Sequence, residues 1–261
     1  MRGRSLVHLG LISCSFLLTL SLPAWGQSSS LTLDQILARM QQADSDSRAQ
    51  SIAYTVTREY QLSAQGAQHP SSDVVAQVNF IPPAAKDYSI VKSEGSDRGT
   101  GIVRKVLDHE AEMAGHSEQH EISRRNYDFA LLGRETVDGH ECYVLQLKPK
   151  RQAADLINGK AWVDAQNFAL RQIKGATAKN PSMWIKGLTL TINYGQVNGV
   201  WLQTSTQAVA DVRFAGPHVL TSRELEVRPA LLNAQTKSQW QARQRRNNRY
   251  VEADAAAWMA R

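Results

Sequence analysis

Three histidines form the most suggestive cluster for catalysis in this sequence: His109, His116 and His120. His116 and His120 are four residues apart, a spacing that brings two imidazoles to one face of a helix. With Glu112 or Glu121 they would supply part of the zinc site of a metal-dependent hydrolase. The His-Glu-x-x-His order of zinc peptidases is missing, however. A polar helix end is therefore the favoured interpretation, and the hydrolase is a minor alternative.

Other reactive groups lack the motifs that would activate them. The sequence has no Gly-x-Ser-x-Gly elbow, and the glycine-rich stretch Gly95–Gly101 lacks the lysine of a phosphate-binding loop, which predicts a flexible turn. Cys142 lies in the apolar run Cys142–Leu145, which is typical of a buried, inert thiol. We therefore expect a protein that is not an enzyme, with no catalytic residue, bound metal or cofactor.

The elements that position these residues begin with two predicted helices. The first covers Leu33 to Gln42, with Thr32 or Ser30 as its cap. The second covers about Ile102 to Ser117, with one apolar stripe that the three histidines would continue. That stripe contains Ile102, Val106 and Met113.

Strand patterns dominate the rest of the chain. From Ser51 the apolar residues alternate, with Ile52, Tyr54, Val56, Tyr60 and Leu62 on one face, and then Val74, Ala76, Val78 and Phe80. Further strands are predicted at Tyr88–Lys92, Tyr127–Val137, His140–Leu147, Lys160–Val163, Phe168–Ile173, Met183–Tyr194, Val200–Val212 and Val219–Val227.

Short turns between these strands indicate antiparallel pairing. Asp138-Gly139 and Asn198-Gly199 are favoured hairpin turns, and a parallel sheet would need crossover helices that the second half lacks. We predict an α+β fold, a large curved antiparallel sheet (an unclosed half-barrel) with two or three covering helices. So few helices leave part of the concave apolar face uncovered, and this trough suits an acyl chain, because each buried methylene contributes about 0.8 kcal/mol.

Eight residues are the predicted ligand-binding wall of this hydrophobic cavity: Tyr54, Val56, Arg58, Tyr60, Phe80, Trp162, Trp184 and Trp201. Arg58 stands out among them, because a charge within an apolar face is costly unless it is paired. It would either pair with Glu94 or another carboxylate at the sheet rim, or reach a lid carbonyl or a lipid headgroup. The structural role is favoured.

The first residues predict export. Arg2 and Arg4 precede the uncharged stretch Leu9–Leu22, and small residues precede Gln27. This pattern is typical of a cleavable secretory signal peptide over residues 1–26. Cys14 follows a stretch that looks like a lipobox, so lipid anchoring there is a minor alternative. The body lacks the run of about 20 apolar residues that a membrane-spanning helix needs.

The chain has 261 residues, of which 42% are hydrophobic and 21% charged, a composition that argues against a wholly disordered chain. Its net charge of +6 comes from one end, because residues 229–261 hold six basic and two acidic side chains. We expect a half-barrel domain over residues 27–228 and a partly helical or disordered basic tail over 229–261. The tail could touch anionic membrane, and no nucleic-acid partner is expected.

Several stretches carry a resemblance to a known family. They are Ile36–Met40, Tyr54–Tyr60, Gly159–Asp164, Phe168–Ile173 and Asn198–Leu202. With them, the segment from about Leu31 to Val227 resembles the outer-membrane lipoprotein-sorting superfamily, the LolA-like periplasmic carriers. The resemblance implies an unclosed barrel capped by helices, whose cavity shields the lipid anchor of a client lipoprotein.

The resemblance also implies what this protein does and where. The expected function is non-catalytic binding of a lipid or acylated protein in the periplasm, including carriage during lipoprotein sorting. Relatives with this fold also act as envelope-stress sensors, so an envelope sensor or protein-binding module is the alternative.

Overall fold

The computed structural model describes residues 31–83 and 85–229. The chain divides into two units, Met1–Leu31 and Thr32–Arg261, and the sheet and helices belong to the second. The predicted signal peptide, Cys14 and residues 230–261 of the predicted tail lie outside the described residues. The division into a signal peptide, a domain over 27–228 and a tail over 229–261 therefore stays a prediction.

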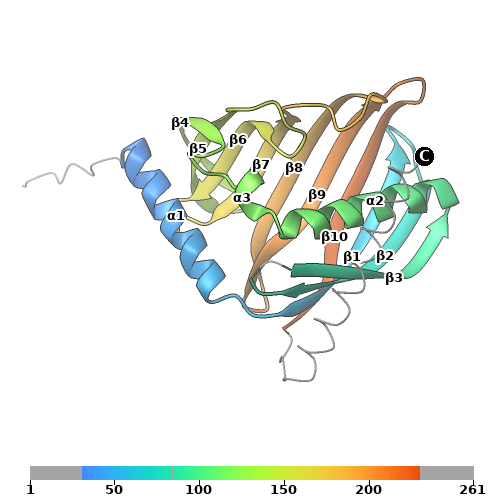
Figure 1. Cartoon of the computed structure of the whole chain (residues 1–261), viewed down its shortest axis with the longest axis horizontal. Coiled ribbons are helices and arrows are strands. Elements are labelled where there is room, and N and C mark those ends of the chain that lie inside the picture. Colours follow the sequence, from blue (N-terminus) through green and yellow to red (C-terminus); the bar gives the residue numbers. More distant parts are fainter. Residues whose placement is uncertain (1–30, 84, 230–261) are drawn as a thin grey trace, which may run out of the picture. The chain divides into compact units, whose positions relative to one another are not determined.

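One antiparallel sheet of ten strands forms the body, in the order β3-β2-β1-β10-β9-β8-β7-β6-β5-β4 (Figure 1). The two edge strands, β3 and β4, do not pair with each other, so the sheet is not closed. The predicted α+β half-barrel is thus confirmed. The strands are β1 Tyr54–Ala64, β2 Ser72–Ile81, β3 Ala85–Gly95, β4 Tyr127–Val137, β5 His140–Pro149, β6 Ile157–Asp164, β7 Leu170–Thr177, β8 Ile185–Val197, β9 Val200–Val212 and β10 Gly216–Pro229.

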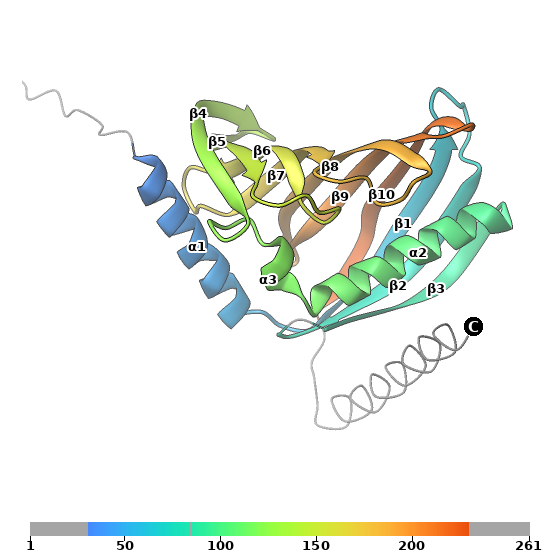
Figure 2. The same ribbon diagram turned by 45° about the horizontal axis from the view of Figure 1, so that its top comes forward.

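Within residues 31–83 and 85–229, three helices accompany the sheet: α1 Leu33–Ala49, α2 Asp97–Ala114 and α3 Ser117–His120. Because α2 and α3 connect the two opposite edge strands, the chain must cross one face of the sheet between them. Figures 1 and 2 show α2 over β1–β3 and α1 beside the β4–β7 side. Among the described residues, none of the helices has the length and apolarity needed to cross a membrane.

The predicted hairpins are present at both turn sequences. Asp138 and Gly139 have φ values of 48° and 79°, and Asn198 and Gly199 have 50° and 82°. Two consecutive residues with positive φ are what a two-residue type I′ turn requires, and it fits the twist of the strands it joins. These turns fix the register of β4 with β5 and of β8 with β9, since Val137 pairs with His140 and Val197 with Val200.

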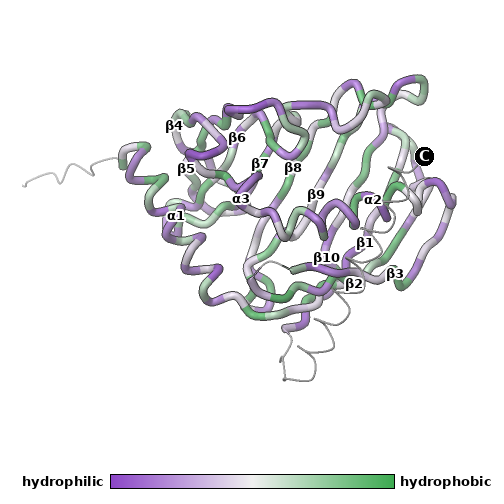
Figure 3. Tube along the Cα trace, in the orientation of Figure 1, coloured by the Kyte–Doolittle hydropathy of each residue, from purple (hydrophilic) through white to green (hydrophobic). Residues whose placement is uncertain are grey.

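Alternation along the strands sets which side chains are buried. In β1 the buried residues are Val56, Arg58, Tyr60 and Leu62, and in β2 they are Ser72, Val74, Ala76 and Val78. Figure 3 shows hydrophobic and hydrophilic residues succeeding one another along the strands and helices. The predicted period of two in this region is confirmed.

The two long helices differ from their predicted extent. A capping box starts α1, in which the Gln35 amide donates to Thr32 Oγ1 and the Thr32 amide to Gln35 Oε1, and the helix continues to Ala49. The apolar stripe predicted for the second helix is wrong: Val103 and Leu107 are buried, while Ile102 is 40% exposed.

The cause lies at the start of α2. The helix begins at Asp97 behind the N-cap Ser96, and Gly99 lies so close to β2 that a Cβ there would be 2.3 Å from Ser72 Oγ. This close approach fixes which side of the helix faces the sheet. The helix ends at Ala114, so His109 does not share a helix with His116 and His120.

Candidate functional site

A cavity of about 1170 Å³ lies between α1, the segment around α3 and the β6–β9 part of the sheet. Ligand pockets in proteins commonly measure about 300–1,000 Å³, so this space could hold a sizeable ligand. Its apolar wall comes from α1, the segment after α3 and the strands. These lining residues are Leu37, Met40, Ile122, Tyr127, Ile157, Phe168, Leu170, Ile173, Ile192, Tyr194 and Trp201.

Two tyrosines give this wall an amphipathic character. Tyr127 is almost fully buried, and its Oη accepts a hydrogen bond of 3.1 Å from the amide of Ile157. Burial raises the pKa of Tyr127, and it raises the pKa of Tyr194 to about 12. Both phenols are therefore neutral hydrogen-bonding groups in a mainly apolar wall at physiological pH.

His120 adds a basic group to the same wall. Its Nδ1 is buried and has no hydrogen-bond partner among the described residues. Burial lowers the pKa of His120, helped by the charges of Lys86 and His109 and opposed by Asp155. Burial therefore favours the neutral imidazole at this position, because the charged form would lose its solvation.

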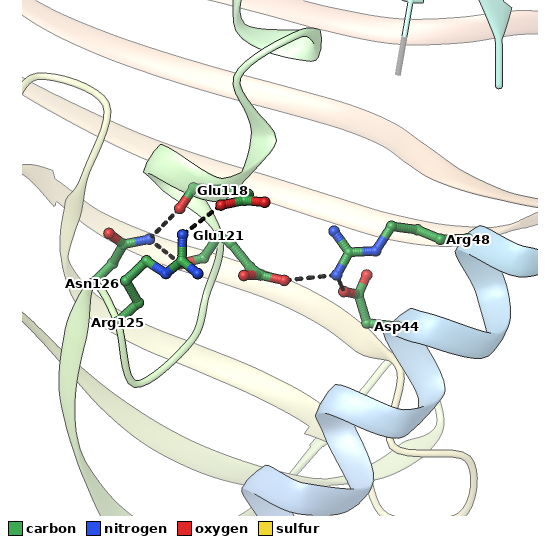
Figure 4. Close-up of polar contacts among 6 residues, drawn as sticks. All are labelled: Asp44, Arg48, Glu118, Glu121, Arg125 and Asn126. Carbon is green, nitrogen blue, oxygen red and sulfur yellow. Dashed lines mark hydrogen bonds and ion pairs between the residues drawn. The ribbon is translucent and has the colours of Figure 1, made fainter. Parts of the chain in front are cut away.

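Helix α1 covers the cavity with its apolar side and is fastened by polar contacts at its ends. Ile36, Leu37 and Met40 are buried beneath it. Arg48, near its C-terminal end, donates to Glu121 Oε1 at 2.6 Å and also pairs with Asp44 (Figure 4).

The N-terminal end of α1 and the turn that receives the helix are also held by polar side chains. Asp34 pairs with Arg124, which precedes β4. In Figure 4 the Asn126 amide donates to the carbonyls of Glu118 and Glu121, which fixes the turn that carries Glu121. The cover of the cavity is thus held by ion pairs at both of its ends.

A smaller cavity of about 390 Å³ lies near the end of α1 and the start of β1. Tyr54, Phe80 and Trp201 line it, and the rings of Tyr54 and Phe80 are 5.1 Å apart. Trp201 lines both cavities. These three are the predicted wall residues that the structure places at a cavity.

The part of the sheet beneath α2 is filled by its own side chains. Val56 and Tyr60 belong to this core, and neither lines a cavity described above. The complete set of its buried members is Val56, Tyr60, Val74, Ala76, Val78, Val103, Leu107, Val200, Leu202 and Val227. The predicted trough is therefore filled by side chains beneath α2 and contains the cavity beneath α1.

Arg58 lies in this filled part and is 5% exposed. Its Nη2 donates to the carbonyl of Gln203 at 2.6 Å, and its Nη1 is 3.8 Å from Glu110 Oε2 on α2. The rim residue Glu94 was the wrong candidate partner, because it pairs with Lys92. Arg58 thus connects β1, β9 and α2, while its Nε is buried without a partner among the described residues.

The remaining two predicted wall residues lie elsewhere. Trp162 packs with Cys142 and Val144, and its indole nitrogen donates to Glu135 at 2.8 Å. Its neighbour Ala161 belongs instead to the apolar cluster next to the cavity. Trp184 is 58% exposed in the turn before β8.

The residues considered for catalysis are not assembled into a centre. Among residues 31–83 and 85–229, no three His, Cys, Asp or Glu side chains form a group that could hold a metal ion. His116 occupies the N-cap position of α3 without a capping bond from its side chain, and His120 is the last residue of that helix. Cys142 is fully buried, as predicted, and burial raises the pKa of its thiol, which keeps it protonated.

Sequence reasoning missed most of the cavity wall. Leu170, Ile173, Ile192 and Tyr194 lie on β7 and β8, which were predicted as strands but given no ligand-binding role. On β8 the apolar residues follow the same period of two as those of the filled core. The available signal was the low content of helix in the second half, which leaves those strands without a covering segment of their own.

Comparisons with known proteins reveal a few likenesses. A family model described as "-like: Uncharacterized protein" matches residues 108–227. No curated protein matches the chain.

Among solved structures, a DUF1329 family protein from Desulfovibrio piger has 15% identity and a TM-score of 0.39, covering 77% of this chain and 94% of that one. A LolA superfamily protein from Nitrosomonas europaea has 12% identity and a TM-score of 0.35, with coverages of 79% and 97%. A putative outer membrane lipoprotein-sorting protein domain from Vibrio parahaemolyticus has 14% identity and a TM-score of 0.39, with coverages of 76% and 94%. The fold class of this chain rests on the strand order and the helices described above.

Proposed function

We propose that this protein is an exported, non-catalytic carrier that binds a lipid or the acyl group of a lipoprotein in the cavity beneath α1. The single observation that carries the proposal is the vacant, mainly apolar space of about 1170 Å³. An acyl chain gains about 0.8 kcal/mol for each methylene buried there, which favours such a ligand over a polar one. The resemblance of the sequence to lipoprotein-sorting carriers points the same way and supports a periplasmic location.

The wall suggests how such a ligand would lie. Its chain would run along Ile173 and Ile192, and its polar end would face Tyr194 or Tyr127. Neutral donors and acceptors suit an ester or amide headgroup without the cost of burying an unpaired charge. Trp201, the predicted wall residue shared by both cavities, would contact the ligand near the end of α1.

Filling the cavity tests the proposal directly. Ile192→Trp places an indole in the vacant space, and we expect the affinity for a fluorescent fatty acid to fall at least tenfold. Leu188→Trp is the matched control. Leu188 lies on the same strand, four residues before Ile192, and does not line the cavity. Equal affinities of the two variants would contradict binding in this cavity.

The alternative, an envelope sensor or protein-binding module on the same fold, makes a different prediction. Extraction of protein purified from its native envelope, followed by lipid mass spectrometry, should recover acyl species if the protein is a carrier. A sensor without a lipid ligand would yield none and would leave the fatty-acid probe unbound by the unmodified chain.

A further inference from the structure

Three large apolar side chains are exposed close together at one end of the sheet. They lie several residues along the strands from those that line the cavity. Met183 and Trp184 end the β7–β8 loop and are 77% and 58% exposed, and Phe214 in the β9–β10 turn is 97% exposed. Ile185 pairs with Val212, so the two turns lie side by side. We call Met183, Trp184 and Phe214 the apolar tip.

The apolar tip is held in place by the backbone. The amide of Arg213 donates to the carbonyl of Trp184, and its Nε donates to the carbonyl of Met183, each at 2.8 Å. Both loops are therefore fastened to one another before any partner arrives. Preorganised groups lose less conformational entropy on binding than mobile ones do.

Phe214 adopts a conformation that its residue type disfavours. Its φ is 66°, in the left-handed region that suits glycine or asparagine, and a bulky residue there is a genuine outlier. The ring gains no packing in return, because almost all of it is exposed. An unfavourable backbone and an unburied aromatic ring both point to a partner outside the chain.

The charges around the tip indicate what that partner is. Lys179 and Arg213 are exposed on the same two loops, and Lys186 is exposed at the adjoining start of β8. One exposed acidic residue, Asp211 near the end of β9, lies beside them. Tryptophan and phenylalanine insert at the boundary between headgroups and acyl chains, and basic residues beside them pair with anionic headgroups. We propose that the apolar tip docks the protein on the surface of a bilayer containing anionic phospholipids.

A bilayer explains the shape of this surface better than a protein partner does. Two adjoining turns with three apolar side chains form a protrusion, while a stable protein interface buries about 800 Å² on each partner. The tip also stands apart from the proposed ligand cavity: Ile185 and Ile192 are separated by seven residues of strand, about 23 Å. The proposal therefore holds whether or not the cavity binds a lipid.

Vesicle binding of the full chain tests the docking. The probes are vesicles of phosphatidylethanolamine with phosphatidylglycerol and vesicles of phosphatidylcholine alone, and the variant is the double substitution Trp184→Ser with Phe214→Asn. Asparagine tolerates the left-handed conformation, so the fold should be kept. We expect the full chain to prefer the anionic vesicles and the double variant to bind them at least tenfold more weakly.

A matched double variant, Val91→Ser with Leu225→Ser, removes two other exposed apolar side chains, 53% and 46% exposed, and should bind as the unmodified chain does. Undiminished binding by the tip variant would overturn the proposal, because the basic tail is present in both chains. Sedimentation velocity measures self-association of the unmodified chain and of the tip variant. If the tip variant only abolishes self-association and the unmodified chain ignores vesicles, the tip contacts a second copy of this chain and bilayer docking is excluded.

Discussion

The part of the sheet beneath α2 and the part beneath α1 have similar sequence patterns, but side chains fill the first and a cavity lies over the second. We call them the filled side and the vacant side. Beneath α2, Val103 and Leu107 fill the concave face and pack with the residues of β1 and β2. Beneath α1, the strands bear equally apolar residues, but the helix lies over a space of about 1170 Å³. The difference arises from how each helix is attached, since α2 approaches β2 closely at Gly99, while α1 is fastened through ion pairs of exposed side chains.

This comparison shows that a period of two in the sequence does not distinguish a core from a binding wall. Both have alternating apolar residues, and only the docking of a helix decides which face becomes filled. We therefore expect substitutions in the filled side to change the stability of the protein, and substitutions in the vacant side to change its ligand affinity.

The largest expected effect is on the filled side. Leu107→Ala removes a fully buried side chain from α2 and should lower the free energy of unfolding by about 2–5 kcal/mol, because it leaves a cavity in close packing. Leu170→Ala, in the half-buried wall of the vacant space, should cost only about 1 kcal/mol. Urea denaturation measures both, and equal losses would show that the two sides are packed alike.

Arg58 should give the next largest effect, again on stability. Arg58→Ala leaves the Gln203 carbonyl without its donor and Glu110 without its cation, so we expect a loss of about 2–4 kcal/mol in the free energy of unfolding. Affinity for the fatty-acid probe should be unchanged, because Arg58 does not line the cavity. A large loss of affinity in the folded variant would instead give Arg58 a direct role in ligand binding.

Much of the fold was predictable, because its determinants are local. Asp138-Gly139 and Asn198-Gly199 set two hairpins, and alternation placed Val56 and Tyr60 on the buried face. The cavity wall depends on which helix covers which strands, which no local pattern encodes. The face of Trp162 was missed for a similar reason, because the small neighbour Ala161 is the residue on the cavity side.

The partner of Arg58 could not be predicted from the sequence for a related reason. Glu110 comes from α2, 52 residues further along the chain, and its position depends on the orientation of that helix. The predicted stripe of Ile102 and Val106 would have turned a different side of α2 toward the sheet. A shift of one residue in a helix rotates the side-chain direction by about 100°. The wrong stripe therefore hid the contact between Arg58 and Glu110.

A smaller effect is expected from the ion pairs that fasten α1. The double substitution Arg48→Gln with Arg124→Gln removes contacts to Glu121 and Asp34, each worth about 0.2–1 kcal/mol at the surface. We expect faster amide hydrogen exchange in α1 and faster release of the fatty-acid probe. High salt should produce the same change in the unmodified protein. Exchange in α2 is the internal control, and an equal acceleration there would mean general destabilisation.

The smallest expected effect concerns pH and the wall of the vacant side. Since burial lowers the pKa of His120 in the folded state, the unfolded chain binds its proton first as the pH falls below 6.5. The contribution of His120 to stability is therefore present above that pH and is lost progressively below it. His120→Gln should reduce the slope of unfolding free energy against pH in this range. Because the vacant side contains this group and a bound acyl chain would exclude water from it, ligand-loaded protein should show a steeper slope than ligand-free protein. Equal slopes in the loaded and ligand-free proteins would place the ligand away from this wall. An unchanged slope in His120→Gln would show that His120 does not contribute to the pH dependence.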